Sequence, residues 1–261
     1  MEIETTIRLT VFLSLFALFA LLERVAPKVL PVHSKKRRWV TNFSITILNT
    51  FLLRALAIGL PFLAVGAAVD SAQMEMGIFN FLIWPTWIEV VLAILLLDLV
   101  IWVQHLITHK VPFLWRLHRV HHSDVEFDVS TAIRFHPVEI AFSMLLKIGA
   151  VYLIGPAVLA VILFEISLNA LAMFNHANIA VPKSLDKLLR FVIVTPDMHR
   201  VHHSINQEEH DRNYGFALSL WDRLFGTYSC GGQTDITVGL EWQDTRPTKL
   251  RWSLWLPFIR K

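Results

Sequence analysis

Four long apolar stretches run along the chain, with polar or charged segments between them. The first three cover residues from about 5 to 24, 41 to 68 and 84 to 108, and each is long enough to cross a bilayer as a helix. The fourth, from about 138 to 176, is nearly twice the usual length and contains Gly155-Pro156, which breaks a helix. We therefore expect an all-α polytopic membrane stem of about four spans, the last of them a Pro-broken helical hairpin.

The composition supports a membrane location. Hydrophobic residues make up 54% of the 261 residues and charged residues only 17%, whereas a soluble domain carries about 25% charged residues. The net charge is +3, and the basic residues lie outside the apolar stretches. This distribution indicates membrane topology and contact with anionic lipid, and we expect no nucleic-acid partner.

No linker rich in Ser, Gly or Pro divides the chain, so we expect one domain over 1–261. Within it we distinguish two N-terminal spans (1–83), a catalytic core (84–230) and an interfacial C-terminal segment (231–261). In that last segment Trp and Phe alternate with Arg and Lys, which is typical of headgroup contact; a solvated tail with a few buried aromatics is the alternative. The first stretch follows Glu2 and Glu4 and has no cleavage site, so we interpret it as a retained span and not as a signal peptide.

Loop charges predict the orientation of the stem. The loop after the second stretch, 69–83, has no Lys or Arg and contains Asp70 and Glu75. The positive-inside rule therefore places the loop between the first two stretches in the cytoplasm, and the third stretch returns to that side. The basic residues of this first loop are Arg24, Lys28, Lys35, Lys36, Arg37 and Arg38.

The hexapeptide His-Arg-Val-His-His-Ser occurs twice, at 118–123 and at 199–204. Its histidines have i, i+3 and i+4 spacing, which places them on one face of a helical turn. Six ordinary buried histidines would need many hydrogen bonds, and as cations they would repel one another, whereas a metal binds neutral imidazoles. Together with an upstream i, i+4 pair there are eight candidate ligands, more than one ion takes, so we expect two metals. The eight are His105, His109, His118, His121, His122, His199, His202 and His203.

The remaining chemistry limits the kind of site. Cys230 is the single cysteine, so disulfides within the chain and Cys-based metal sites are excluded. Imidazole suits zinc, copper, iron and nickel, but the chain has neither the His-Glu-x-x-His motif of zinc proteases nor a Glu-x-x-His pair. Asp98 lies seven residues before His105, and we expect it to accept a hydrogen bond from a ligand imidazole or to join two helices. Arg54 and Lys147 are charges inside apolar stretches, where they line a polar path, bind a headgroup or snorkel.

Taken as a set, the histidine clusters and the words around them resemble the fatty acid hydroxylase/sterol desaturase superfamily. The resemblance covers roughly 90–230. The words are Leu114-Trp115-Arg116-Leu117 before the first hexapeptide, Thr131-Ala132-Ile133-Arg134-Phe135-His136-Pro137, Asn175-His176, Thr195-Pro196, Asn213-Tyr214-Gly215 and Trp221-Asp222-Arg223-Leu224-Phe225-Gly226-Thr227.

This resemblance implies an integral membrane enzyme with two non-haem iron ions, which uses O2 and two electrons to hydroxylate or desaturate a lipid alkyl chain or a sterol. It implies a membrane stem with a cytosolic His-rich cap and the metals at their junction. The eight clustered histidines would be ligands with His176 as a ninth, and His136 would support a ligand or the fold. No electron-transfer module is fused to the chain, so a reductase, cytochrome, ferredoxin or reduced pterin would supply the electrons.

Two other functions compete with this interpretation. A divalent-metal transporter would carry polar ligands in the middle of several spans, whereas these histidines lie at span ends and in loops. A zinc-dependent membrane hydrolase would need no O2.

Overall fold

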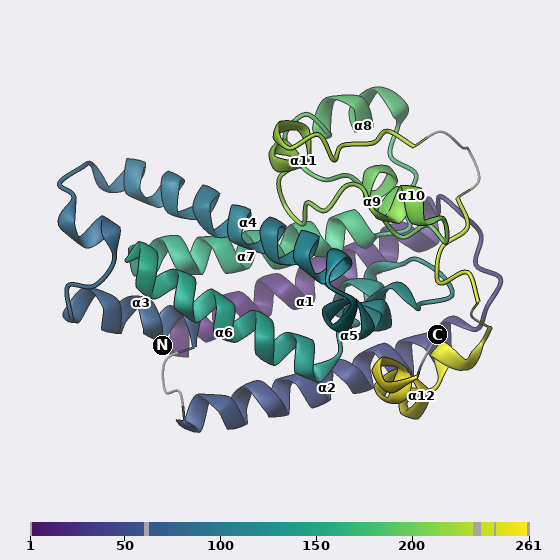
Figure 1. The fold of residues 1–261 in the computed structure, drawn as a ribbon. Coiled ribbons are helices and arrows are strands. Elements are labelled where there is room, and N and C mark those ends of the chain that lie inside the picture. Colours follow the sequence, from purple (N-terminus) through teal and green to yellow (C-terminus); the bar gives the residue numbers. More distant parts are fainter. Residues whose placement is uncertain (1, 60–62, 232–235, 243, 260–261) are drawn as a thin grey trace.

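The computed structural model describes residues 2–59, 63–231, 236–242 and 244–259 (Figure 1). These residues form α-helices and short 3₁₀ helices joined by loops, with three isolated β-bridges. The α-helices are α1 (Glu2–Val25), α2 (Lys35–Gly59), α3 (Ala64–Gln73), α4 (Thr86–Lys110), α5 (Pro112–His122), α6 (Pro137–Ile154), α7 (Val158–His176), α8 (Lys183–Leu189), α9 (Pro196–His202), α10 (Gln207–His210), α11 (Leu220–Leu224) and α12 (Leu250–Trp255). The 3₁₀ helices are η1 (Ile78–Phe81), η2 (Val129–Ile133), η3 (Arg246–Thr248) and η4 (Leu256–Phe258).

Five of these helices, α1, α2, α4, α6 and α7, are long and apolar enough to cross a membrane. The all-α stem is therefore confirmed, and the fourth apolar stretch supplies two of its helices. Gly155 ends α6 in the left-handed conformation, with φ of 68°. A Cβ atom there would lie 2.6 Å from the carbonyl oxygen of Met76, so both the backbone conformation and the close approach require glycine.

The second apolar stretch differs from the expected single span. Helix α2 begins at Lys35, well before residue 41, and two of its first basic residues are paired: Lys35 with Glu23 of α1 and Arg38 with Asp124. The stretch also continues past α2 as the separate short helix α3, with residues 60–62 outside the described residues. Helix α3 buries Ala64, Ala67 and Ala68 and packs against α6 and α7.

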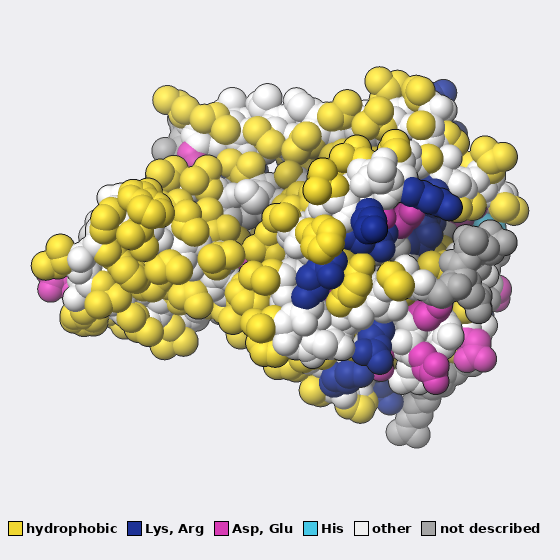
Figure 2. All heavy atoms as spheres, turned by 90° about the horizontal axis from the view of Figure 1, so that it is seen from above, with side chains coloured by type: hydrophobic (Ala, Val, Ile, Leu, Met, Phe, Trp, Pro, Cys, Tyr) yellow, Lys and Arg dark blue, Asp and Glu magenta, His cyan; other side chains and the backbone are white. Residues whose placement is uncertain are grey.

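The long helices lie side by side and form the stem, and most of the other segments, α5 and α8 to α12 among them, gather at one end as a cap (Figure 1). Helix α3 lies at the far end, while the α1–α2 loop lies at the cap end. Apolar side chains cover the stem, whereas Lys, Arg, Asp and Glu concentrate on the cap (Figure 2). This division is that of an integral membrane protein with a polar cap.

A buried ion pair joins the stem to the cap. Arg38 at the start of α2 donates to both carboxylate oxygens of Asp124 at 2.7 and 2.9 Å, and to Asp128 at 2.8 Å. Burial alone would raise the pKa of Asp124, but the Arg38 guanidinium holds it well below its usual range. Because Arg38 is 1% exposed, these charges compensate one another out of water.

The C-terminal segment packs partly against the cap. Leu256 and Ser253 are fully buried, and Arg119 of α5 donates to the carbonyl oxygens of Leu256 and Ile259. Trp255 remains 63% exposed. The interfacial position that we expect for the C-terminal segment stays a prediction.

Candidate metal centre

All nine histidines predicted as metal ligands meet at the junction of stem and cap, where they form two groups. Within each group the nitrogen atoms lie within 4.8 Å of one another, and every member is buried. The first group holds His105, His109, His118, His122 and His202. The second holds His121, His176, His199 and His203.

The two hexapeptides each contribute to both groups, in opposite proportions. In the first copy the i, i+4 pair His118 and His122 joins the five-histidine group, and His121 joins the other. In the second copy the pair His199 and His203 joins the four-histidine group, and His202 crosses to the first. The repeated motif therefore links the two groups, since each copy bridges them.

Several imidazoles are held by their Nδ1 atoms, which donate to acceptors of the fold. His105 donates to the carbonyl oxygen of Tyr214 at 2.6 Å, His202 to that of Arg212 at 2.7 Å, and His176 to that of Ala172 at 2.7 Å. An Nδ1–H donor fixes the tautomer that leaves the Nε2 lone pair free for a metal. These three bonds therefore prepare Nε2 for coordination.

His118 has a carboxylate in the same role. Its Nδ1 lies 2.6 Å from Oε1 of Glu139, which is in the first turn of α6 and 4% exposed. The sequence prediction did not include Glu139. In the sequence, Glu139 could have been identified as a carboxylate three residues after His136, at the start of an apolar stretch.

The opposing Nε2 atoms fit a bound ion. The Nε2 of His105 lies 3.0 Å from those of His118 and His202, and the Nε2 of His176 lies 3.1 Å from those of His121 and His199. Several buried ring nitrogens have no hydrogen-bond partner among the described residues. A buried nitrogen without a partner is costly, and an ion would supply the missing partner of one ring nitrogen in His109, His122 and His203, so the donor set fits metal ions. The unpaired atoms are the two ring nitrogens of His109, the two of His122, Nδ1 of His121, Nδ1 of His199 and Nε2 of His203.

The environment keeps the cap imidazoles neutral. Burial lowers the pKa of His118 to about 3, with a smaller contribution from His210. Burial, followed by the neighbouring imidazoles, also lowers the pKa of His121 and that of His203 well below the usual range. Neutral imidazole is the form that coordinates a metal.

Asp98 does not accept from a ligand imidazole as expected. Its Oδ2 instead accepts from the indole Nε1 of Trp221 at 2.8 Å. Seven residues of helix separate Asp98 from His105 by about 10 Å, which is too far for a direct contact, whereas α11 of the cap brings Trp221 alongside. Asp98 thus joins the stem to the cap.

A second buried carboxylate, that of Asp222, also joins the stem to the cap and supports the metal centre indirectly. Asp222 accepts from the Trp102 indole at 3.0 Å and from the backbone nitrogens of Tyr214 and Gly215 at 2.8 Å each. This positions Tyr214, whose carbonyl oxygen holds His105.

His136 takes a structural role. It is the N-cap of α6, where its Nδ1 accepts from the backbone nitrogen of Val138 at 3.2 Å. It belongs to neither histidine group. This hydrogen bond caps the N-terminus of α6, the first helix of the α6–α7 hairpin.

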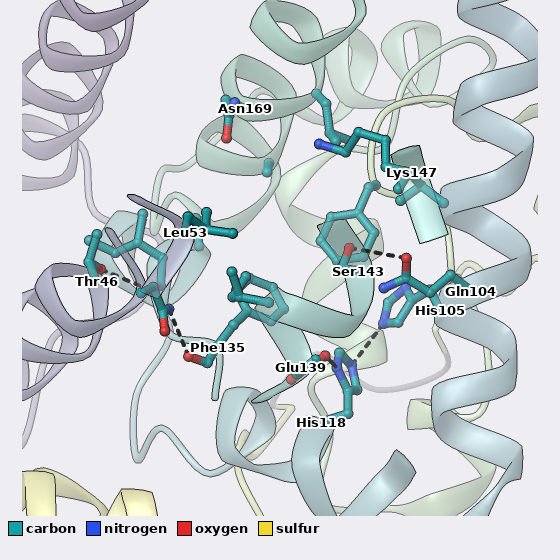
Figure 3. A pocket seen from close by; sticks show the side chains of 18 of the residues that line it. Thr46, Leu53, Gln104, His105, His118, Phe135, Glu139, Ser143, Lys147 and Asn169 are labelled. Atoms are coloured by element: carbon teal, nitrogen blue, oxygen red, sulfur yellow. Dashed lines mark hydrogen bonds and ion pairs between the residues drawn. The ribbon is translucent and has the colours of Figure 1, made fainter. Parts of the chain in front are cut away.

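A cavity of about 310 Å³ leads from the stem to the histidines (Figure 3). Helices α2, α4, α6 and α7 supply most of its wall, and His105 and His118 of the five-histidine group lie at its cap end. Oε2 of Glu139 has no hydrogen-bond partner among the described residues, and Glu139 lines the same cavity. Glu139 thus presents an unpaired carboxylate oxygen beside the cavity, next to His118.

Comparison with known proteins gives one family match. Residues 90–227 match the fatty acid hydroxylase family model, which is more than half of the chain. No solved structure matches the chain.

Several curated relatives are enzymes that act on lipids. An ornithine lipid hydroxylase from Rhizobium tropici is 31% identical over 221 residues, covering 84% of this chain and 66% of the relative. An alkylglycerol monooxygenase from Danio rerio is 35% identical over 147 residues, covering 56% and 31%. Cholesterol 25-hydroxylase from Homo sapiens is 28% identical over 141 residues, covering 53% and 50%. The chain thus spans about two thirds, one third and one half of their lengths.

Proposed function

Because the chain belongs to the fatty acid hydroxylase family, we propose that it is an integral-membrane oxidoreductase that hydroxylates a lipid with O2 and two electrons. The observation that carries this proposal is the pair of adjoining buried histidine groups, one of which places His105 and His118 at the end of a cavity between the stem helices. An unactivated C–H bond needs an oxidant stronger than any side chain, so a metal centre must supply it. Desaturation by the same centre is the nearest alternative outcome.

We assign two iron ions to the groups, one to each. Two nitrogens that bind one ion, each about 2.1 Å from it, lie no more than about 4.2 Å apart. The Nε2 separations of 3.0 to 3.1 Å in the two groups meet that condition. When bound, the iron pair supplies the activation of O2.

The described residues account for the other requirements. Glu139 and the carbonyl oxygen of Tyr214 orient His118 and His105 at the cavity end. Phe135 stacks on His121 with ring centroids 4.2 Å apart, and Phe216 also lines the cavity. These rings exclude water beside the ligands and press a substrate chain toward them.

We propose that the cap faces the cytoplasm and receives electrons there from a separate donor. Lys36 and Arg37, in the first turn of α2 beside the α1–α2 loop, are exposed at the cap end, which supports that orientation. Arg38 supports this orientation less strongly, because it forms buried ion pairs with carboxylates of the cap. The segments 1–83, 84–230 and 231–261 remain our proposed division into spans, catalytic core and interfacial segment.

A metal transporter is less well supported, since the ligand candidates lie at one end of the stem. A zinc hydrolase is less well supported, since the family model is that of fatty acid hydroxylases and the relatives are hydroxylases and monooxygenases.

The experiment is lipid profiling of cells with and without the gene, complemented by the wild type, His121→Ala or His33→Ala. We expect the wild type and His33→Ala to restore a lipid that carries one added oxygen atom, and His121→Ala to fail. His33 is a suitable control because it pairs with Glu126 away from both groups. Restoration by His121→Ala, or a lipid change that persists without O2, would contradict the proposal.

A further inference from the structure

Lys147 is a charged residue near the middle of the membrane stem, at the eleventh position of the eighteen-residue helix α6. Its Nζ donates to Oε1 of Glu165 on α7 at 2.7 Å. The other carboxylate oxygen of Glu165 accepts from Arg8 on α1, and Arg8 also pairs with Glu4. An ion network inside a span is costly and needs a reason.

One reason is structural, since the network ties α1, α6 and α7 together. That reason applies equally to Arg8 and Lys147, yet the two cations lie in different surroundings. Lys147 lines the cavity that ends at His105 and His118, whereas Arg8 does not. Lys147 thus has access to whatever enters the cavity.

The wall near Lys147 is polar although it lies among spans. Ser143, one turn before Lys147, donates to the side-chain oxygen of Gln104 at 3.1 Å, and Asn169 lies opposite (Figure 3). An ammonium group has three N–H donors, and among the described residues one of them is used by Glu165. A plain hydrocarbon chain would leave the remaining donors without partners, at a cost.

The charge balance indicates what kind of group would fit. The network contains two cations, Arg8 and Lys147, and two carboxylates, Glu4 and Glu165. An added anion would leave it with a net negative charge inside the membrane, whereas a neutral oxygen acceptor preserves the balance.

We propose that Lys147 is the anchor of a subsite that accepts a neutral oxygen of the lipid, such as a hydroxyl or an ether oxygen. That this lipid is the substrate rests on the proposed function; the binding itself does not.

The subsite would set which carbon reaches the histidines. Glu139, Ser143 and Lys147 have i, i+4 and i+8 spacing and so lie on one face of α6. Glu139 contacts His118, and eight residues of helix span about 12 Å. An oxygen held at Lys147 would therefore place a carbon about 12 Å further along the chain beside His105 and His118.

The test uses purified full-length protein as isolated, in detergent micelles without O2 or an electron donor, so that it measures binding without turnover. Three twelve-carbon probes carry an alkyl diazirine at one end and a hydroxyl, a methyl or a carboxylate group at the other. After irradiation, mass spectrometry measures the labelling of cavity residues near the histidines, such as Phe135 and Ile101.

We expect the hydroxyl probe to label these residues about tenfold more than the methyl probe, as the loss of a hydrogen bond to a charged group predicts. Lys147→Met should abolish this preference. Arg8→Met should retain it, because it removes the other partner of Glu165 but no cavity wall. The carboxylate probe should label less than the hydroxyl probe.

Equal labelling of wild-type protein by the hydroxyl and methyl probes would overturn the proposal without any variant. So would an equal loss of preference in Arg8→Met, which would show that the network is only structural. Strongest labelling by the carboxylate probe would refute the neutral-oxygen assignment. If Lys147→Met does not fold, Asn169→Leu, on the opposite wall, should reduce the preference, and an unchanged preference in that variant would count against the subsite.

Discussion

Replacing Glu139 tests how the fold controls a single candidate ligand. In Glu139→Gln the side chain keeps its size and one acceptor oxygen but loses the carboxylate that lies 2.6 Å from Nδ1 of His118. Partners of this kind change metal affinity by about 10-fold to 100-fold. We expect about a tenfold weaker retention of iron in Glu139→Gln, and a loss near 100-fold in Glu139→Leu, which leaves the buried Nδ1–H of His118 without an acceptor.

The assay is competition for iron between the purified protein and a chelator of known affinity, with thermal unfolding measured in parallel. Asp98→Asn is the matched control, because Asp98 is also a buried carboxylate at the stem–cap junction but accepts from Trp221. It should lower the unfolding temperature and leave the iron affinity of the folded protein unchanged. Iron retention by Glu139→Leu at the wild-type level, or an equal loss in Asp98→Asn, would refute the reasoning.

Three further predictions concern stability. Asp222→Ala removes the acceptor of Trp102, Tyr214, Gly215 and Thr227, so it should lower the free energy of unfolding by about 3 kcal/mol, and an unchanged denaturant midpoint would contradict this role. Gly155→Ala should destabilise the protein by about 1 kcal/mol or more, because residue 155 has a positive φ and a Cβ atom there would meet the Met76 carbonyl oxygen. Gly149→Ala is the control: Gly149 has open space around it, so this variant should be neutral or stabilising by up to about 1 kcal/mol. Thermal unfolding of the two variants tests this difference. Metal-free protein should lose stability as the pH falls below about 6.5, since the unfolded chain then binds a proton that the folded chain excludes from His118, whose folded-state pKa is about 3. For this residue the loss in the free energy of unfolding is about 2 kcal/mol at pH 5. Equal unfolding midpoints at pH 5 and pH 7.5 would contradict it.

Local spacing was enough to predict the histidine groups. The i, i+3 and i+4 pattern fixes which face of a helix each imidazole occupies, and the structure brings His105, His109 and both hexapeptides together. His176 was not given by spacing but by the family resemblance, and it lies in the four-histidine group. The division into five and four was not predictable, because it depends on how the fold places α5 and α9 relative to each other and not on either sequence alone.

The supporting carboxylates were harder to predict. Asp98 was singled out because it shares a helix stripe with His105, yet its partner Trp221 lies 123 residues later in the chain. Glu139 contacts His118 across a loop, and the Tyr214 and Arg212 carbonyl groups are backbone atoms, which residue identity does not reveal.

Hydropathy predicted the spans but not all of their ends. Helix α2 begins at Lys35 because Asp124 and Asp128 neutralise Arg38, a long-range contact that a hydropathy pattern does not contain. Helix α3 buries its alanine face against α6, a long-range contact that hydropathy also does not contain.

The central claim, two oxygen-activating irons held by two histidine groups, is tested most directly by metal analysis of the purified wild-type protein together with its O2 consumption on a lipid extract. The account predicts two irons per chain and O2 uptake that requires lipid and an added electron donor, with one iron lost in variants of either group, such as His122→Ala and His199→Ala. Zinc as the bound metal, with a lipid-hydrolysing activity that persists without O2, would contradict it.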